Sequence, residues 1–307
     1  MKRLASLSLA VLALTSIAAT SASAQADYKF GKVTRAELER TDYPAIADGA
    51  DAVVIDGLTD VIVVQWNRDQ AITYEVNTEI SRKIKILTEE GAEKQARVTI
   101  DLGSADGYTE DCAKASIKAV SYTLVDGDIV ETEINKSDIK YVRHPDDTAC
   151  LEFLVPNTVA GSVIEYTYVK RANIKNGGSK RITDSGFMIF PMQHDIPALR
   201  SRCSVAIGTI PAGCGSFASF KEGAHPVKSK RAKITKSVSG TNWKIDRPYR
   251  VGWRGYYGDY SYLSSSNYGE YETTVYTADD LPAKQGGDAA CIRLAWSKSP
   301  DSRQTCN

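Results

Sequence analysis

The stretch Cys150–Lys170, CLEFLVPNTVAGSVIEYTYVK, decides the fold, because apolar and polar residues alternate on both sides of a short loop. Successive side chains of a strand point to opposite faces, so each arm has one apolar face. Pro156 and Gly161 belong at the ends of the loop, since proline cannot donate to a strand ladder and glycine tolerates a positive φ. The stretch predicts a half-buried β-hairpin with a six-residue loop and no obvious nucleophile or metal ligand. The apolar positions are Leu151, Phe153, Val155, Ile164, Tyr166 and Tyr168.

Most of the remaining chain has the same two-residue period. The clearest case is Tyr74–Leu87, where the alternation predicts one buried face and one face in water. A capping-box pattern at Thr34–Glu37 predicts one short helix. Short strands at regular spacing with few helices indicate an all-β protein, an antiparallel β-sandwich with few short helices.

Turn dipeptides between apolar runs predict how these strands connect. We expect hairpins about Asp56-Gly57, Asp126-Gly127 and Ser239-Gly240. The sequence Glu89–Gly91 predicts a turn that returns the chain to pair with the strand before it. Ser137 and Asp138 predict a single helical turn.

Arg82 interrupts the apolar face of the Tyr74–Leu87 strand. A buried cation requires a carboxylate or several carbonyl groups around it. The preferred interpretation is a structural ion pair, and the alternative is an arginine that binds a ligand.

The first residues have the pattern of a secretory signal. Lys2 and Arg3 precede an apolar run, and the small residues Ala22-Ser23-Ala24 follow it. We therefore expect a signal peptide at residues 1–24 and a secreted or periplasmic protein. The chain carries 38 basic and 38 acidic residues, a balance that gives no bulk reason to bind nucleic acid.

Six cysteines follow the predicted signal, and export would place them in an oxidising compartment, so disulfides are the first interpretation. Chain order suggests three pairings. No pair has zinc-finger spacing and the chain has three histidines, so no metal site and no cofactor are predicted. The pairings are Cys112 with Cys150, Cys203 with Cys214, and Cys291 with Cys306.

Residues 249–285 form a segment rich in tyrosine, glycine and serine. This composition is typical of adaptable binding surfaces, where exposed rings stack on sugars or peptides. The alternative is an extended hairpin with ordinary surface tyrosines. We expect residues 25–248 to be the sandwich and the polar residues 286–307 to be a poorly ordered tail. The candidate binding residues are Trp253, Tyr256, Tyr257, Tyr260 and Tyr262.

Four blocks of sequence occur in an order that resembles a known family. They are Arg82–Gly91, Tyr122–Gly127, Leu154–Tyr166 and the run that ends at Asp195-Ile196-Pro197. Together they resemble the domain of unknown function found at the N-terminus of many bacterial transglutaminase-like proteins. The resemblance implies a secreted β-sandwich that normally precedes a papain-like catalytic domain. Only 24 residues follow Ala283 here, so it implies the non-catalytic module alone.

The sequence gives little support for catalysis by residues of this chain. The sharpest enzyme hypothesis pairs a cysteine such as Cys214 with His194 and Asp195, but no helical pattern follows Gly213-Cys214-Gly215. The sequence therefore predicts an exported, non-catalytic module that binds or positions a protein, peptide or envelope polymer. One alternative is an accessory subunit of a transglutaminase-like or protease-like enzyme, and a less favoured one is a stand-alone cysteine hydrolase.

Overall fold

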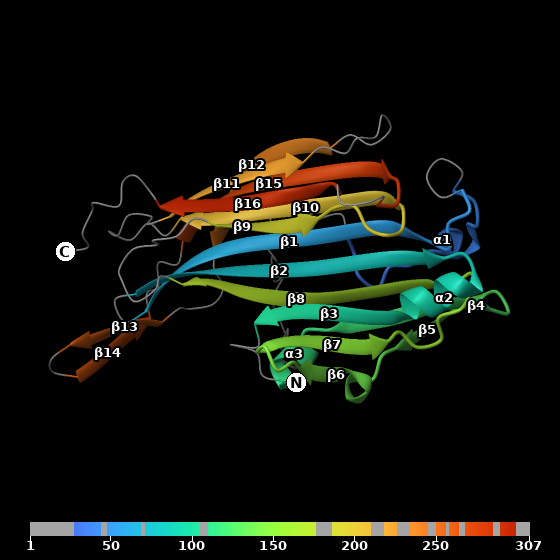
Figure 1. Ribbon diagram of the computed structural model, residues 1–307, viewed down its shortest axis with the longest axis horizontal. Helices are drawn as coiled ribbons and strands as arrows, with labels where there is room; N and C mark the ends of the chain where they lie inside the picture. Colours follow the sequence, from blue (N-terminus) through green and yellow to red (C-terminus); the bar gives the residue numbers. More distant parts are fainter. Residues whose placement is uncertain are drawn as a thin grey trace, which may run out of the picture.

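The computed structural model shows a mostly β protein with a few short helices, as the sequence predicts (Figure 1). It describes residues 28–43, 48–68, 71–104, 110–175, 186–209, 218–225, 234–244, 250–255, 258–263, 268–284 and 289–298. The predicted signal peptide and Cys214 lie outside these residues.

The helices are α1 (Arg35–Glu39), α2 (Glu89–Ala96), α3 (Glu110–Ala115) and the single 3-10 turn η2 (Lys136–Asp138). The strands are β1 (Ala52–Arg68), β2 (Ala71–Ile86), β3 (Arg97–Ser104), β4 (Lys118–Val125), β5 (Asp128–Glu133), β6 (Lys140–Arg143), β7 (Thr148–Leu154), β8 (Val163–Lys175), β9 (Gly186–Pro191), β10 (Ala198–Thr209), β11 (Ala218–His225), β12 (Ile234–Lys244), β13 (Arg250–Gly255), β14 (Gly258–Leu263), β15 (Tyr268–Leu281) and β16 (Cys291–Lys298).

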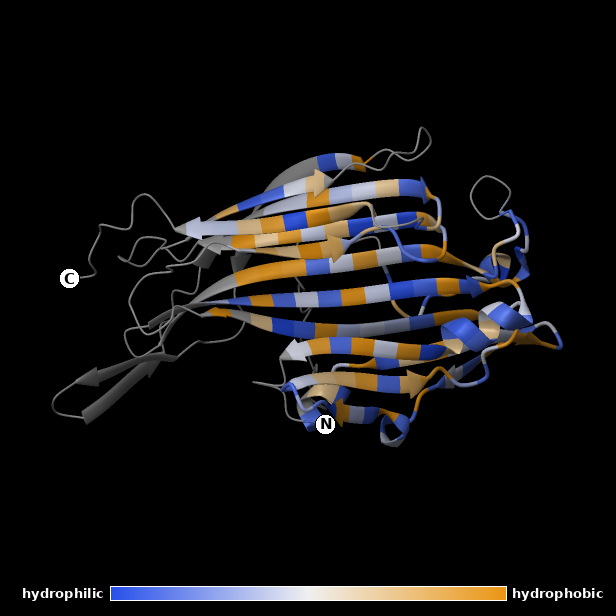
Figure 2. Cartoon of the chain, viewed as in Figure 1, coloured by the Kyte–Doolittle hydropathy of each residue, from blue (hydrophilic) through white to orange (hydrophobic). Residues whose placement is uncertain are grey.

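An eight-stranded sheet forms the centre of the protein, in the order β12-β15-β10-β1-β2-β8-β4-β5. Its strands pair antiparallel except for β1 and β10, which run parallel. Figure 2 shows hydrophobic and hydrophilic residues alternating along these strands, the pattern that places apolar residues on one face of a strand and polar residues on the other.

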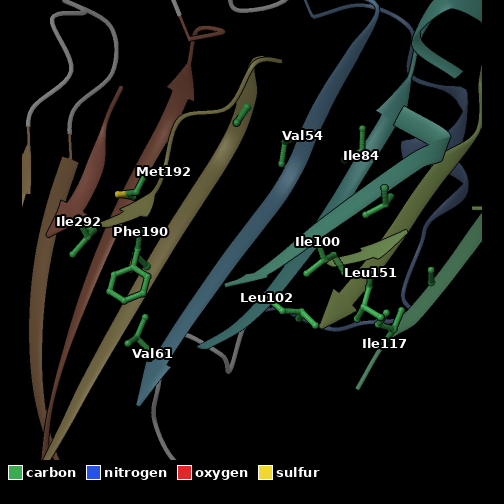
Figure 3. Packing of buried hydrophobic residues seen from close by; sticks show 14 of the residues in the cluster. Val54, Val61, Ile84, Ile100, Leu102, Ile117, Leu151, Phe190, Met192 and Ile292 are labelled. Carbon is green, nitrogen blue, oxygen red and sulfur yellow. The ribbon is translucent and has the colours of Figure 1, made fainter. Parts of the chain in front are cut away.

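Two three-stranded sheets, β11-β16-β9 and β3-β7-β6, pack against the same face of the large sheet. Figure 3 shows Phe190, Met192 and Ile292 beside the large sheet, while Ile100 and Leu151 lie farther along the same core. All five side chains are buried. Burial of this apolar face between layers supplies the main stabilisation of the fold.

The prediction for Cys150–Lys170 is correct in placing two strands there, but wrong in pairing these strands with each other as a hairpin. β7 lies between β3 and β6, whereas β8 lies between β2 and β4 in the large sheet. The connection therefore crosses from one layer of the sandwich to the other. Leu151 and Phe153 are buried on the core side of β7, as their period predicts.

Two predicted turns are continuous strands. β1 runs through Asp56-Gly57 with a bulge between Val54 and Asp56, and β12 runs through Ser239-Gly240. The hairpin about Asp126-Gly127 is confirmed, since both residues have the positive φ that its turn requires. The capping box of α1 and the helical turn η2 are also confirmed.

The predicted turn at Glu89–Gly91 is instead the start of α2. Thr88 caps this helix through a hydrogen bond from the Gly91 N–H to its hydroxyl oxygen at 3.0 Å. β3 then pairs with β7 rather than with β2.

The C-terminal part of the chain differs from the prediction that the sandwich ends at residue 248. β15 lies between β12 and β10, and β16 is the central strand of its small sheet. Tyr276 and Ile292 are buried in the common core. Residues 268–281 and 291–298 therefore belong to the sandwich and are not an extension and a poorly ordered tail.

The face of the β2 strand predicted to be in water is largely buried. Residues from Tyr28 onward cover it, and Lys85 donates hydrogen bonds to the carbonyl oxygens of Leu38 and Gly161. Burial lowers the pKa of Lys85 to about 8. Leu38 packs with Tyr122 in a second, smaller core. No helix among the described residues is long and apolar enough to cross a membrane.

Asp60 makes the stability of the fold depend on pH. It is 5% exposed and lies opposite Glu79 in the β1–β2 ladder. Burial, with a smaller contribution from Glu79, raises its pKa from 3.8 to about 6. The stabilisation from holding its proton is complete below pH 4 and is lost as the pH rises through 6, which corresponds to roughly 2–3 kcal/mol.

We expect Asp60→Asn to remove the decrease in stability between pH 4 and pH 6, because the asparagine side chain does not ionise. Urea unfolding at pH 4 and pH 7.5 should show a smaller decrease in unfolding free energy for Asp60→Asn than for the parent. Asp126→Asn, an exposed site in a turn, is the matched control and should keep the parental difference. An equal decrease in all three proteins contradicts the assignment to Asp60.

Candidate ligand-binding cleft

A cleft of about 790 Å³ lies where β3 and β9 face each other across the middle of the large sheet. Its floor consists of β1, β2 and β8, one wall is β3, and the other wall is β9 with the following bend. The size is within the usual range for small-ligand sites. The polar lining residues are Thr59, Thr78, Arg82, Asp101, Tyr166, Tyr168, Lys170, Arg171 and His194.

Arg82 occupies the floor of this cleft and is 7% exposed. One terminal nitrogen, Nη1, donates to the carbonyl oxygens of Leu58 at 2.9 Å and Ser81 at 2.8 Å. The other, Nη2, donates to the Thr59 hydroxyl at 3.3 Å. The partners given for Arg82 among the described residues are therefore uncharged. The predicted structural ion pair is corrected to a set of neutral oxygen acceptors.

Two tyrosines lie beside Arg82 on β8. Tyr166 is directly opposite Arg82 in the β2–β8 ladder, and Tyr168 is opposite Ile80. Their rings stack with centroids 6.4 Å apart and an angle of 19°. Burial raises the pKa of Tyr168 to about 12, so both rings act as neutral hydrogen-bonding groups at neutral pH.

The charges that line the cleft are predominantly positive. Arg82, Lys170 and Arg171 contribute three cations, against one carboxylate from Asp101. Asp101 accepts a hydrogen bond from the Gly103 N–H at 2.7 Å and lies at the exposed edge of β3. The partly enclosed floor strengthens the field of the Arg82 charge, because little water screens it.

His194 forms part of the β9 wall. Its Nε2 atom is buried and has no hydrogen-bond partner in the structure. Burial, with a smaller effect of the nearby Arg82 charge, lowers the pKa of His194 to about 3. The imidazole is therefore neutral at physiological pH, and His194 contributes a neutral side chain to the wall of the cleft.

The described cysteines are free thiols. Cys150, Cys203 and Cys291 form no disulfide, so each of the three predicted pairings is corrected. Their expected partners Cys112, Cys214 and Cys306 lie outside the described side chains. The error came from deriving disulfides from an expected export signal, whereas Cys203 lies fully buried within the central sheet.

These thiols are not activated. Burial raises the pKa of Cys150, Cys203 and Cys291, which disfavours the thiolate that a nucleophile requires. The Sγ atom of Cys150 lies 3.5 Å from Nε2 of His144. The carboxylates of Glu152 and Asp101 add to the shift at Cys150. The predicted combination of Cys214 with His194 and Asp195 lies partly outside the described residues.

Three of the aromatic binding residues predicted from composition, Trp253, Tyr260 and Tyr262, fall on the two-stranded sheet β13-β14. Trp253 pairs with Tyr260 in its ladder, and Tyr262 lies on β14. The side chains of these three residues, together with Tyr256 and Tyr257, lie outside what the structure describes. Stacking on their rings stays a prediction.

Sequence reasoning singled out two residues of the cleft, Arg82 and, in the enzyme hypothesis, His194, and it assigned Tyr166 and Tyr168 to a buried face. Lys170 gave no signal, because a lysine on a strand is usually solvated. Among the described residues, no group of three or more histidine, cysteine, aspartate or glutamate side chains is placed to hold a metal ion.

Comparisons with known proteins give distant structural similarities. No family model matches the sequence, and no curated protein matches it. A "putative protease" from Parabacteroides distasonis is 10% identical, with a TM-score of 0.48 over 81% of this chain and 41% of that chain. A two-domain M1 zinc metallopeptidase variant bound to L-tryptophan is 9% identical, with a TM-score of 0.29 over 84% and 45%. The chain spans less than half the length of either protein, and neither similarity carries an argument about its activity.

Proposed function

We propose that this chain is an exported, non-catalytic binding module whose cleft holds a carboxylate or phosphate group of a protein, peptide or envelope polymer. The observation that carries the proposal is the position of Arg82, a buried cation that faces a cleft and has only neutral partners among the described residues. A buried charge is costly unless it is paired. An anionic ligand would supply the missing opposite charge.

The geometry of the side chain favours this chemistry. A guanidinium group has five N–H donors in a planar fork that matches carboxylate and phosphate oxygens. Two donors of Nη1 and one of Nη2 are used to fix the group against β1 and β2, which holds the fork in place. Lys170 and Arg171 also line the cleft, and their positive charge favours the approach of an anion.

The absence of an activated nucleophile in the described residues supports a binding role. A cysteine enzyme needs a thiolate, whereas burial raises the pKa of all three described thiols. His194 is neutral at physiological pH and stays so well into the acid range, which makes it a poor general acid or base.

The sequence resemblance supports the wider setting. In the family that the four blocks resemble, the β-sandwich accompanies a transglutaminase-like catalytic domain. We infer a module that presents its bound polymer or polypeptide to another catalytic unit, with export directed by residues 1–24.

Replacing Arg82 tests the proposal. We expect Arg82→Met to weaken binding of poly-L-glutamate and polygalacturonate by at least tenfold, since a charged hydrogen-bonded pair contributes about 1.5–3 kcal/mol. Arg82→Lys should retain part of the affinity. Isothermal titration calorimetry at two salt concentrations measures the effect.

Arg200→Met is the matched control, because Arg200 is an exposed arginine that pairs with Asp279 away from the cleft. Should Arg82→Met not fold, Lys170→Ala should lower affinity about threefold through loss of one cation at the cleft. Affinities that are unchanged in the folded cleft variants, or no binding of either polymer by the parent, would overturn the proposal.

A further inference from the structure

Both walls of the cleft are unpaired strand edges. β9 is the last strand of β11-β16-β9, and β3 is the last strand of β3-β7-β6. Among the described residues each pairs on one side only, with β16 and β7 respectively. An edge strand presents a row of free N–H and C=O groups that can pair with another chain.

The two edges differ in how well they are protected. β3 carries the Asp101 carboxylate and an irregularity between Asp101 and Gly103, where the glycine has φ +72°. Charges and bulges of this kind discourage strand pairing. β9, GFMIFP, has an uninterrupted register with β16 and contains no charged residue. Its edge is therefore the open one.

The exposure of side chains on β9 agrees with this difference. Phe187 and Ile189 are 52% and 54% exposed, which is unusual for large apolar side chains on an edge strand. Met188 and Phe190 pack toward the core, and the cleft is lined by Met188, Ile189, Phe190 and Pro191. Proline cannot donate a hydrogen bond, so it ends the stretch that can pair.

We propose that the occupant of the cleft is an extended peptide segment with an acidic side chain, which adds as a strand along the free edge of β9. This inference rests on the proposed function and names its partner class. Backbone hydrogen bonds to residues 186–190 would supply affinity, and the acidic side chain would reach the Arg82 guanidinium on the floor. Such a strand has alternate side chains on opposite faces, so one face contacts the cleft floor while the other remains outside.

The other lining groups suit a polypeptide. The stacked tyrosines Tyr166 and Tyr168 on the floor offer apolar ring surface to side chains of a bound strand. The excess of positive charge in the cleft selects against basic segments. A polysaccharide could satisfy Arg82 but has no regular backbone donors and acceptors for the edge of β9.

The experiment uses acetylated octapeptides that alternate glutamate with valine or threonine, and measures their binding by fluorescence anisotropy. A second set carries N-methyl groups on alternate backbone amides, which removes strand pairing without changing side chains. A third set has glutamine in place of glutamate. We expect affinity to fall at least tenfold for the second and third sets, and amide exchange of residues 186–190 to slow on binding of the first set.

The outcomes separate this inference from the proposed function. Equal affinity for the N-methylated peptides, or protection on β3 instead of β9, would overturn strand addition. Arg82-dependent binding of polygalacturonate without binding of any peptide would also overturn it and leave the anion-binding function in place. If Arg82→Met binds both the glutamate peptides and polygalacturonate as tightly as the parent does, the proposed anion-binding function itself is wrong. Ile189→Lys, at an exposed position that should tolerate the change, is expected to weaken peptide binding because a lysine on an edge strand discourages pairing.

Discussion

Glu165→Ala should lower the free energy of unfolding by about 3–5 kcal/mol, because Glu165 accepts two short hydrogen bonds and each hydrogen bond to a carboxylate contributes about 1.5–3 kcal/mol. Glu165 is fully buried on β8, on the face of the large sheet away from the cleft. It accepts hydrogen bonds from the Gly31 N–H at 2.7 Å and the Tyr28 hydroxyl at 2.9 Å. The Tyr122 hydroxyl is a weaker donor at 3.5 Å. Truncation leaves the partly buried Tyr28 and Gly31 donors and the buried Tyr122 hydroxyl without this acceptor.

The N-terminal segment should be the first part of the chain to lose order in this variant. Tyr28 and Gly31 are attached to the large sheet through Glu165, so amide exchange of residues 28–33 should accelerate along with the loss of global stability. Urea unfolding gives the free energy and hydrogen exchange gives the location.

Two controls make the Glu165 result specific. Glu165→Gln keeps an acceptor in the same place and should cost no more than about 1–2 kcal/mol, since the carboxylate's pKa is already raised, mainly by burial. Glu152→Ala removes an exposed carboxylate from β7 and should change stability by less than about 0.5 kcal/mol. A loss below 1 kcal/mol for Glu165→Ala contradicts the assigned role.

The buried position of Glu165 shows what the sequence could not reveal. Its alternation with Ile164 and Tyr166 correctly placed it on the opposite face of the strand, but that face was expected to be in water. Whether a face is wet depends on what covers it, and here residues from Tyr28 onward lie across it. The two-residue alternation of a sequence shows which side chains share a face of the strand. It does not show whether other parts of the chain cover that face.

The same limit explains which turns were predicted correctly. Asp126-Gly127 joins two neighbouring strands and adopts positive φ at both residues. Asp56-Gly57 has the same composition, yet β1 continues through it because β2 and β10 pair on either side. Tertiary pairing outweighed the local preference, and the bulge next to Asp56 absorbed the irregularity.

The cleft depends on the relative placement of strands that are far apart in the sequence. Arg82 was visible in the sequence because it broke an apolar row. Its setting was not, since the cleft exists only because β3 and β9 end their small sheets on either side of the same floor. Strand order across 200 residues is not encoded in local alternation, which is also why β7 and β8 were paired wrongly.

Gly91→Ala is expected to destabilise the protein by about 3–5 kcal/mol, the opposite sign from the usual effect of alanine in a helix. Gly91 lies in the first turn of α2, where alanine would normally stabilise by about 0.8–1 kcal/mol. A Cβ atom there would overlap the backbone carbonyl of Asp51, and would also lie 3.2 Å from the Asp51 Cβ. The backbone must therefore move.

That movement is costly because the Asp51 carbonyl oxygen is already used. It accepts hydrogen bonds from the Leu87 N–H at 2.9 Å and the Thr88 N–H at 3.2 Å. The Asp51 carboxylate also accepts from the Thr88 hydroxyl and from Lys94. Overpacking of about 1–3 kcal/mol adds to about 1 kcal/mol for each hydrogen bond that is weakened.

Thermal and urea unfolding of Gly91→Ala measure the effect, with Gly223→Ala as the matched control. Gly223 has open space where its Cβ would lie and no positive φ, so alanine there should be neutral or slightly stabilising. Because α2 begins where the chain leaves β2, the clash at Gly91 should also loosen the start of β3, and amide exchange near Arg97 should accelerate. A Gly91→Ala variant as stable as the parent would show that α2 does not pack against Asp51 in solution, and the route from the large sheet to the β3 wall of the cleft would have to differ.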